Sequence, residues 1–159
     1  MLQRAIARLK HNEAWKKVIY IDTKGNVTIG WGFNLGTILV DGKRINPARL
    51  SVVPVQPLPE ALGEQWLLSL FGSVVDILSR LEFWDELDDV RREVLVDLTY
   101  NMGPKVLGFT HFIAQLAAKD YDTAASNMEG WPWRKDVGER RAAPLIRMMR
   151  TGVYEELAG

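Results

Sequence analysis

The sequence predicts a mostly helical α+β fold of two lobes. Three observations support this class: apolar residues at helical spacing over most of the chain, a short strand-like segment near the amino terminus, and a long apolar helix between the two. Of the 159 residues, 47% are hydrophobic and 25% are charged, ordinary values for one globular domain. We therefore expect residues 1–159 to form a single domain.

The first predicted element is an amphipathic helix, whose apolar residues recur at Leu2, Ala5, Ile6 and Leu9. This pattern ends near Asn12, so Glu13 should lie at the exit of the helix. Residues 18–21 and 27–29 are β-branched or aromatic, and residues 22–26 between them tolerate tight turns. These residues predict a β-hairpin.

Residues 30–58 are rich in glycine and proline and lack a helical period, which predicts short strands and loops. Pro59 suits the first turn of a helix whose apolar residues continue to Leu81. We expect a β-containing lobe at residues 13–58, a connecting helix at residues 59–81, and a helical lobe made from residues 1–12 and 82–159.

Four further helices are expected in the helical lobe. Apolar residues keep core spacing over residues 87–102, and Gly103-Pro104 should end that helix. Thr110 and Asp122 are suitable caps for two more helices. The last apolar stripe, over residues 142–149, should end near Gly152.

Composition and charge exclude several classes of function. Twenty basic and twenty acidic residues give no net charge, which argues against a dedicated nucleic-acid binder. The chain has no cysteine, and its two histidines lack metal-ligand spacing, so we expect no disulfide, metal or other cofactor. Charged residues interrupt the apolar run near the amino terminus, so we expect neither a signal peptide nor a membrane anchor. Any chemistry should therefore depend on carboxylates.

The charges are unevenly distributed along the chain. Residues 82–97 hold seven acidic and two basic side chains, whereas residues 134–150 hold six basic and two acidic ones. The simpler interpretation is two solvated helix faces. The alternative is a basic end that attracts an anionic polymer.

Glu13 and Asp22 are the candidate catalytic pair. Glycoside hydrolysis commonly needs two carboxyl groups in unlike environments, one protonated and one ionised. Glu13 follows an apolar helix and precedes Ala14-Trp15, so partial burial would raise its pKa. Asp22 is expected at a hairpin edge among polar residues, where it would be more exposed to solvent than Glu13. Their spacing does not by itself show that the two groups face each other.

Residues 13–32 read EAWKKVIYIDTKGNVTIGWG. This stretch resembles the active-site hairpin of the phage-type lysozymes, the muramidases of glycoside hydrolase family 24. Both family intervals match, with nine residues from Glu13 to Asp22 and six more to Thr28. Later family landmarks follow in the same order, as YNMG at 100–103, GFT at 108–110 and RTG at 150–152. The resemblance therefore covers nearly the whole chain.

The resemblance implies a lysozyme-like fold and an endolysin that cuts the β-1,4 bond between N-acetylmuramic acid and N-acetylglucosamine in bacterial peptidoglycan, which lyses the host. Glu13 would be the general acid, while Asp22 and Thr28 would hold and activate a water on the opposite face of the sugar, giving inversion. Arg141 would pair with Glu13. A cleft between the lobes would bind the glycan through Gly32, Asn34, Tyr100, Phe112, Asn127, Trp133 and Arg141.

The resemblance further implies a monomer that needs no cofactor, accumulates in the host cytoplasm and reaches the wall, in the periplasm, through lesions made by a holin. One departure is clear. Well-known members carry a histidine directly after the second glycine of the motif, where this chain has Phe33. An ion pair of that histidine therefore cannot form here. Residues 37–56 also align poorly with the family, which leaves substrate preference on that side of the cleft open.

Three alternatives remain at this point. The protein could bind glycans without cutting them, or it could be a lytic transglycosylase, but Asp22 and Thr28 beside Glu13 favour hydrolysis over both. The basic helix at residues 139–150 could instead disrupt anionic membranes. We expect its apolar stripe to pack in the core.

Overall fold

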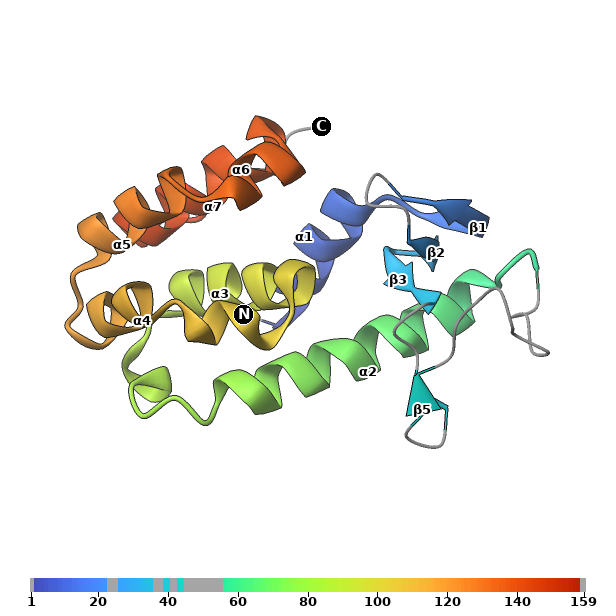
Figure 1. Cartoon of the computed structure of the whole chain (residues 1–159), viewed down its shortest axis with the longest axis horizontal. Coiled ribbons are helices and arrows are strands. Elements are labelled where there is room, and N and C mark those ends of the chain that lie inside the picture. The colour runs from blue at the N-terminus through green and yellow to red at the C-terminus, as the bar shows by residue number, and fades with distance from the viewer. Residues whose placement is uncertain (1, 23–25, 36–38, 41–42, 45–55, 158–159) are drawn as a thin grey trace. The chain divides into compact units, whose positions relative to one another are not determined.

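The computed structural model describes residues 2–22, 26–35, 39–40, 43–44 and 56–157. Its chain forms two compact units. We call residues 9–69 the sheet unit, and residues 1–8 with 70–159 the helical unit. Most described residues are helical and a small antiparallel sheet accompanies them (Figure 1), which confirms the predicted α+β class.

The sheet unit contains the predicted hairpin. β1 (Lys16–Ile21) pairs antiparallel with β2 (Val27–Gly30), and β2 pairs with β3 (Phe33–Asn34). The register of β1 against β2 is interrupted between Lys16 and Tyr20. A second antiparallel pair joins β4 (Leu39–Val40) to β5 (Lys43–Arg44). The predicted turn residues 23–25, and the remainder of the predicted loop at 36–38, 41–42 and 45–55, lie outside the described residues.

Aromatic side chains form the core of the sheet unit. Trp15 and Trp31 have ring centroids 4.4 Å apart, and Phe33 packs edge-on against Trp66 at 5.6 Å. The Trp15 ring lies directly on Gly63, where an added Cβ would be 2.4 Å from the ring. Close ring packing thus explains a glycine inside a helix. The Phe33 position, which lacks the family histidine, holds a buried apolar contact instead.

Two helices contain the boundary between the units. α1 (Leu2–Glu13) ends at the predicted exit, because Ala14 takes a left-handed backbone conformation with φ 48°. α2 (Glu60–Leu78) begins one residue after Pro59, whose carbonyl accepts from the Leu62 and Gly63 amides. The predicted end of this helix at Leu81 was wrong, because α2 ends at Leu78. After it, the amides of Arg80 and Leu81 donate to carbonyls three residues earlier, a tighter turn than that of an α-helix.

α2 is long and apolar enough to cross a bilayer by length and composition. Core helices of soluble proteins share this property, so one such helix is weak evidence for a membrane span. Three of its apolar side chains, Leu67, Phe71 and Leu78, are buried, whereas Leu68 and Leu70 are exposed.

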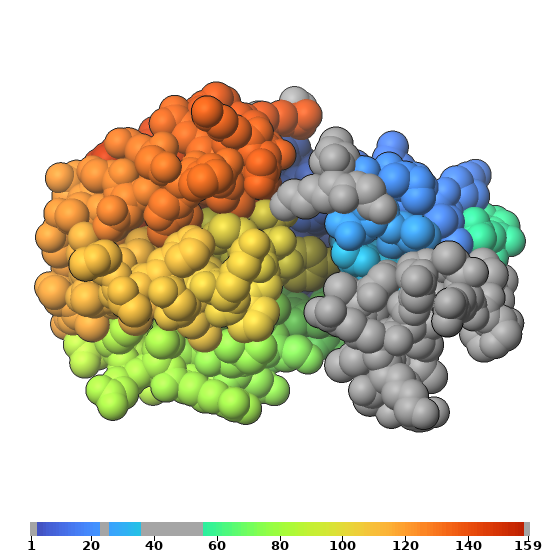
Figure 2. Space-filling model, viewed as in Figure 1, coloured from blue at the N-terminus to red at the C-terminus, as the bar shows by residue number. Residues whose placement is uncertain are grey.

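The helical unit is built around α3 (Asp89–Met102), in which every residue from Glu93 to Thr99 is buried. α7 (Glu139–Thr151) packs against α3, α5 (Tyr121–Glu129) and α6 (Pro132–Val137), and α4 (Thr110–Ala117) packs against α5. Two 3-10 helices, η3 (Trp84–Glu86) and η4 (Pro104–Gly108), flank α3. Figure 2 shows α3 to α7, yellow to red, as one continuous packed surface.

The apolar stripe of α7 is buried, as expected from the sequence. Ala142, Leu145, Ile146 and Met149 are each less than 5% exposed. This stripe therefore belongs to the core of the helical unit. Gly152 ends α7 in a left-handed conformation, and the Arg91 side chain donates to the Met149 and Arg150 carbonyls at this helix end.

Both predicted helix caps were wrong. Thr110 is the first residue of α4, and Phe109 precedes it without a side-chain cap. The cap of α5 is Asp120, whose carboxylate accepts from the Thr123 amide at 3.2 Å, while Asp122 lies in the first turn. Asp120 and Asp122 are the same residue type two positions apart, and only the backbone conformation shows which one precedes the helix.

Candidate active site

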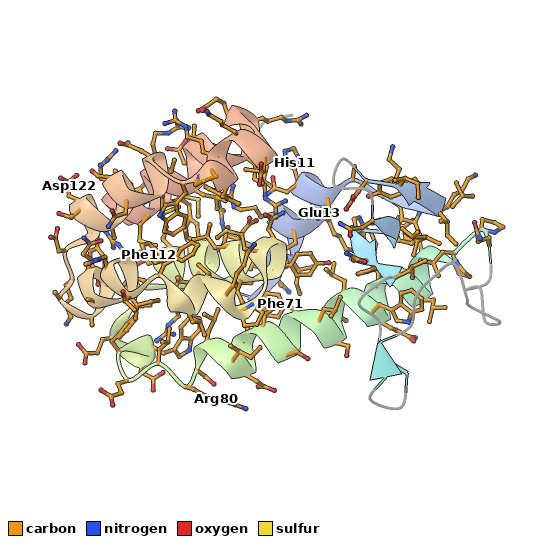
Figure 3. All side chains as sticks on the ribbon, viewed as in Figure 1. His11, Glu13, Phe71, Arg80, Phe112 and Asp122 are labelled. Carbon is orange, nitrogen blue, oxygen red and sulfur yellow. The ribbon has the colours of Figure 1, made fainter. Side chains whose placement is uncertain are left out.

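Glu13 is placed by the last turn of α1 and by a glycine on the sheet. The side chain is half-buried and lies where α1 gives way to β1 (Figure 3). A Cβ added to Gly32 would be 2.5 Å from Glu13 Oε2, so the carboxylate lies directly against the Gly32 backbone. Gly32 also has φ +74°, a conformation that favours glycine. The predicted site residues Glu13 and Gly32 are therefore in contact.

Asp22 is held at the end of β1 by Asn26. Oδ1 of Asp22 accepts from the Asn26 backbone amide at 2.8 Å, and Oδ2 accepts from Asn26 Nδ2 at 3.0 Å. The Asp22 amide donates in turn to the Asn26 carbonyl at 2.9 Å. Donors to both oxygens fix the orientation of the carboxylate. Sequence reasoning did not identify Asn26 as a site residue, although an aspartate and an asparagine bounding a predicted turn are a usable signal.

Thr28 lies on β2 between two polar neighbours. It is 2% exposed, and its hydroxyl donates to the Asn26 carbonyl at 3.2 Å. The register places Tyr20 of β1 opposite Thr28 on one side and Asn34 of β3 opposite it on the other. Directly opposed residues of an antiparallel sheet point to the same face, so Tyr20, Thr28 and Asn34 form one polar row across the sheet. The structure thus brings the predicted residues Thr28 and Asn34 together.

Tyr20 lies in the electrostatic field of both candidate catalytic carboxylates. Burial raises the pKa of its phenol above the usual value, and Glu13 and then Asp22 raise it further. Because the phenolate would be repelled by both carboxylates, Tyr20 stays a neutral hydroxyl. Sequence reasoning did not select Tyr20, because only the strand register shows that it stands opposite Thr28.

Phe112 and Asn127 share a pocket in the helical unit. The pocket has a volume of about 280 Å³ and is lined by Gly108, Phe109, Thr110, His111, Phe112, Asn127 and Trp131. Trp131 packs edge-on against Phe109 and Phe112, with centroids 4.7 and 4.9 Å apart. Phe112, labelled in Figure 3, is 1% exposed and forms part of the pocket wall. Aromatic walls with a few polar groups are typical of ligand sites.

The other predicted binding residues of the helical unit lie on three helices. Trp133 of α6 is 5% exposed, its indole donates to Asn101 Oδ1 at 3.2 Å, and its ring is 6.4 Å from Trp131. Tyr100, the neighbour of Asn101 on α3, is half-buried. Arg141 of α7 donates to Asp97 of α3 at 2.9 Å, and both side chains are buried. The expected pair of Arg141 with Glu13 would join the two units and stays a prediction.

The sheet unit thus holds Glu13 at the end of α1, and Asp22 and Thr28 on the hairpin. A pair of carboxyl groups is what most enzymes that cleave glycosidic bonds use. The family model described as phage lysozyme matches residues 10–148, and the chain belongs to this family. The match confirms the resemblance derived from the sequence. Lysozymes are glycoside hydrolases, and this family includes the endolysins of bacteriophages.

Proposed function

We propose that the protein hydrolyses the β-1,4 bond between N-acetylmuramic acid and N-acetylglucosamine in bacterial peptidoglycan. One observation carries the proposal: the sheet unit holds Glu13 against Gly32, fixes both oxygens of Asp22 and buries Thr28 in the adjoining strand. These are the three residue types of the family motif, and each is positioned by contacts of its own.

In the proposed reaction, Glu13 donates its proton to the glycosidic oxygen as the bond to the anomeric carbon breaks. A water held by Asp22 and Thr28 forms the new bond to that carbon, and its proton passes to the Asp22 carboxylate. Attack from the face opposite the leaving group inverts the anomeric configuration. The charges balance, because Glu13 ends ionised and Asp22 ends protonated until solvent exchanges the protons.

Substrate binding is assigned to both units. In the sheet unit, Gly32 lets the glycan approach the backbone and Asn34 supplies an amide at the end of the polar row. In the helical unit, we assign binding to Phe112 and Asn127 in the aromatic pocket, with Tyr100, Trp133 and Arg141 as further contacts. Aromatic side chains present apolar faces on which sugar rings can stack.

Two substitutions test the catalytic roles. Glu13→Gln and Asp22→Asn keep side-chain size but remove the acid and the base, so each should lower the rate of peptidoglycan digestion by at least about 100-fold. The matched control Glu156→Gln changes an exposed carboxylate and should digest at the wild-type rate. Unchanged digestion by Glu13→Gln would end the proposal, whereas bound but uncut glycan with the wild type would favour the binding-module alternative.

Product analysis separates hydrolysis from the related alternatives. Reducing ends without anhydro-sugars indicate hydrolysis, whereas anhydro-sugar masses indicate a lytic transglycosylase. Proton NMR of the first-formed anomer tests inversion. Because the apolar stripe of α7 is buried, protein-free anionic vesicles should not leak dye, and leakage would favour membrane disruption.

We also propose that the protein is a monomeric endolysin that waits in the host cytoplasm and reaches the wall in the periplasm when a holin opens the membrane. Expression without a holin should leave the culture intact, and co-expression with one should clear it. Lysis without a holin or added permeabilising agent would contradict this route.

A further inference from the structure

Tyr20 shares one face of the sheet with two of the residues to which the proposed function assigns the attacking water. It stands directly opposite Thr28 in the register of β1 and β2. It also precedes Asp22 by two residues. Asp22 directly follows β1, and its amide donates to the Asn26 carbonyl, so the antiparallel pairing continues past Ile21. Residues two apart along a paired strand point to the same side, so Tyr20 is a polar side chain on the same face as both Asp22 and Thr28.

The backbone near Tyr20 is irregular in a way that directs side chains. The pairing of β1 with β2 shifts between Lys16 and Tyr20 and is regular again from Tyr20 to Ile21. Such irregularities change the direction in which a strand presents its side chains. Tyr20 is therefore the first residue after this irregularity that pairs regularly with β2, and the regular pairing continues from it toward Asp22.

The electrostatic surroundings agree with this placement. The Tyr20 phenol is affected by Glu13 as well as Asp22, so it lies within range of the acid and of the second carboxylate. A phenol that stays protonated has an O–H to donate and an oxygen that accepts. No other polar residue of the polar row combines both abilities with a reach as long as that of tyrosine.

We propose that Tyr20 is a further catalytic residue, whose hydroxyl holds the attacking water together with Asp22 and Thr28. The hydroxyl donates to one lone pair of the water, while the water donates one proton toward Asp22. The second lone pair then points to the anomeric carbon. This inference rests on the proposed function and adds a residue to its water-binding set.

Tyr20→Phe tests the inference, because it removes the hydroxyl and keeps the half-buried ring. We expect kcat on soluble peptidoglycan fragments to fall by about tenfold or more, since a water held by fewer groups is less well oriented. KM should stay within about twofold, because the substrate contacts are unchanged. The melting temperature should also stay close to that of the wild type.

Tyr154→Phe is the matched control, because it makes the same chemical change in the helical unit and keeps the ring over which Arg4 is stacked. It should have wild-type kcat. An active wild type with an equally active Tyr20→Phe overturns this inference and leaves the proposed function standing. A rise in KM with unchanged kcat also overturns it, because that result assigns Tyr20 to substrate binding. A wild type that does not release reducing ends overturns the proposed function itself.

Discussion

Gly32 combines two constraints in one residue, a left-handed backbone and contact with the Glu13 carboxylate. In Gly32→Ala the added methyl would stand 2.5 Å from Glu13 Oε2 and would displace the carboxylate that we propose as the acid. Since misplacement of a reacting group by about 1 Å costs about 100-fold in rate, we expect a loss of that size in peptidoglycan digestion. The backbone strain should lower the free energy of unfolding by about 1–2 kcal/mol.

Gly138→Ala separates the two effects. Gly138 has φ +76°, but a Cβ added there would have no atom within 4 Å. This variant should lose stability and keep its activity. Full activity of Gly32→Ala would show that the carboxylate of Glu13 does not need its place against the Gly32 backbone.

The sequence predicts part of the candidate site at this scale. Glu13, Asp22 and Thr28 follow from residue types at family spacing, and the structure shows how Glu13 and Asp22 are held. Asn26 was missed although the aspartate and asparagine that bound the predicted turn are a usable signal. Tyr20 could not be selected, because its place opposite Thr28 depends on strand register, which a linear pattern does not contain.

At the scale of elements, α2 carries two glycines that look equivalent in sequence and differ in the structure. Gly72 is exposed and nothing lies within 4 Å of an added Cβ, whereas the Trp15 ring lies 2.4 Å from one at Gly63. Gly72→Ala should raise the free energy of unfolding by about 0.5–1 kcal/mol, the usual gain inside a helix. Gly63→Ala should lower it by about 1–3 kcal/mol through overpacking.

Denaturant unfolding of the two variants measures this difference, and each serves as the control for the other. Equal stabilisation by both substitutions would mean that Trp15 does not pack on α2. Helical periodicity predicted α2 itself, because its apolar stripe is long. It could not predict which glycine is packed, since that contact comes from a tryptophan 48 residues away in sequence.

At the scale of the whole molecule, at least four of the six basic residues in the segment 134–150 have carboxylate partners within the helical unit. Arg134 bonds Glu139, Arg141 bonds Asp97, and Arg147 bonds Glu155. Arg150 contacts both Asp122 and Glu129. These arginines therefore have carboxylate partners, which favours a role in intramolecular pairing over attraction of an anionic polymer.

Two of these pairs predict how stability depends on pH. A hydrogen bond from Arg134 lowers the pKa of Glu139, and one from Arg147 lowers the pKa of Glu155. The unfolded chain, with glutamate pKa values near about 4.3, therefore binds protons before the folded chain does. The stabilisation from both pairs is present above that pH and is lost as the pH falls through the folded-state pKa values.

The melting temperature should accordingly decline as the pH is lowered from about 6 to about 3, in a range set by glutamate titration. The double variant Glu139→Gln, Glu155→Gln should start from a lower melting temperature and decline less over the same range, because it has fewer shifted carboxyls to protonate. Glu156→Gln, which changes an exposed neighbour, should follow the wild-type curve. Parallel curves for the double variant and the wild type would show that other groups govern acid unfolding.

Both ion pairs are exposed, so salt screens them. The difference in melting temperature between the wild type and the double variant should therefore shrink as the ionic strength rises.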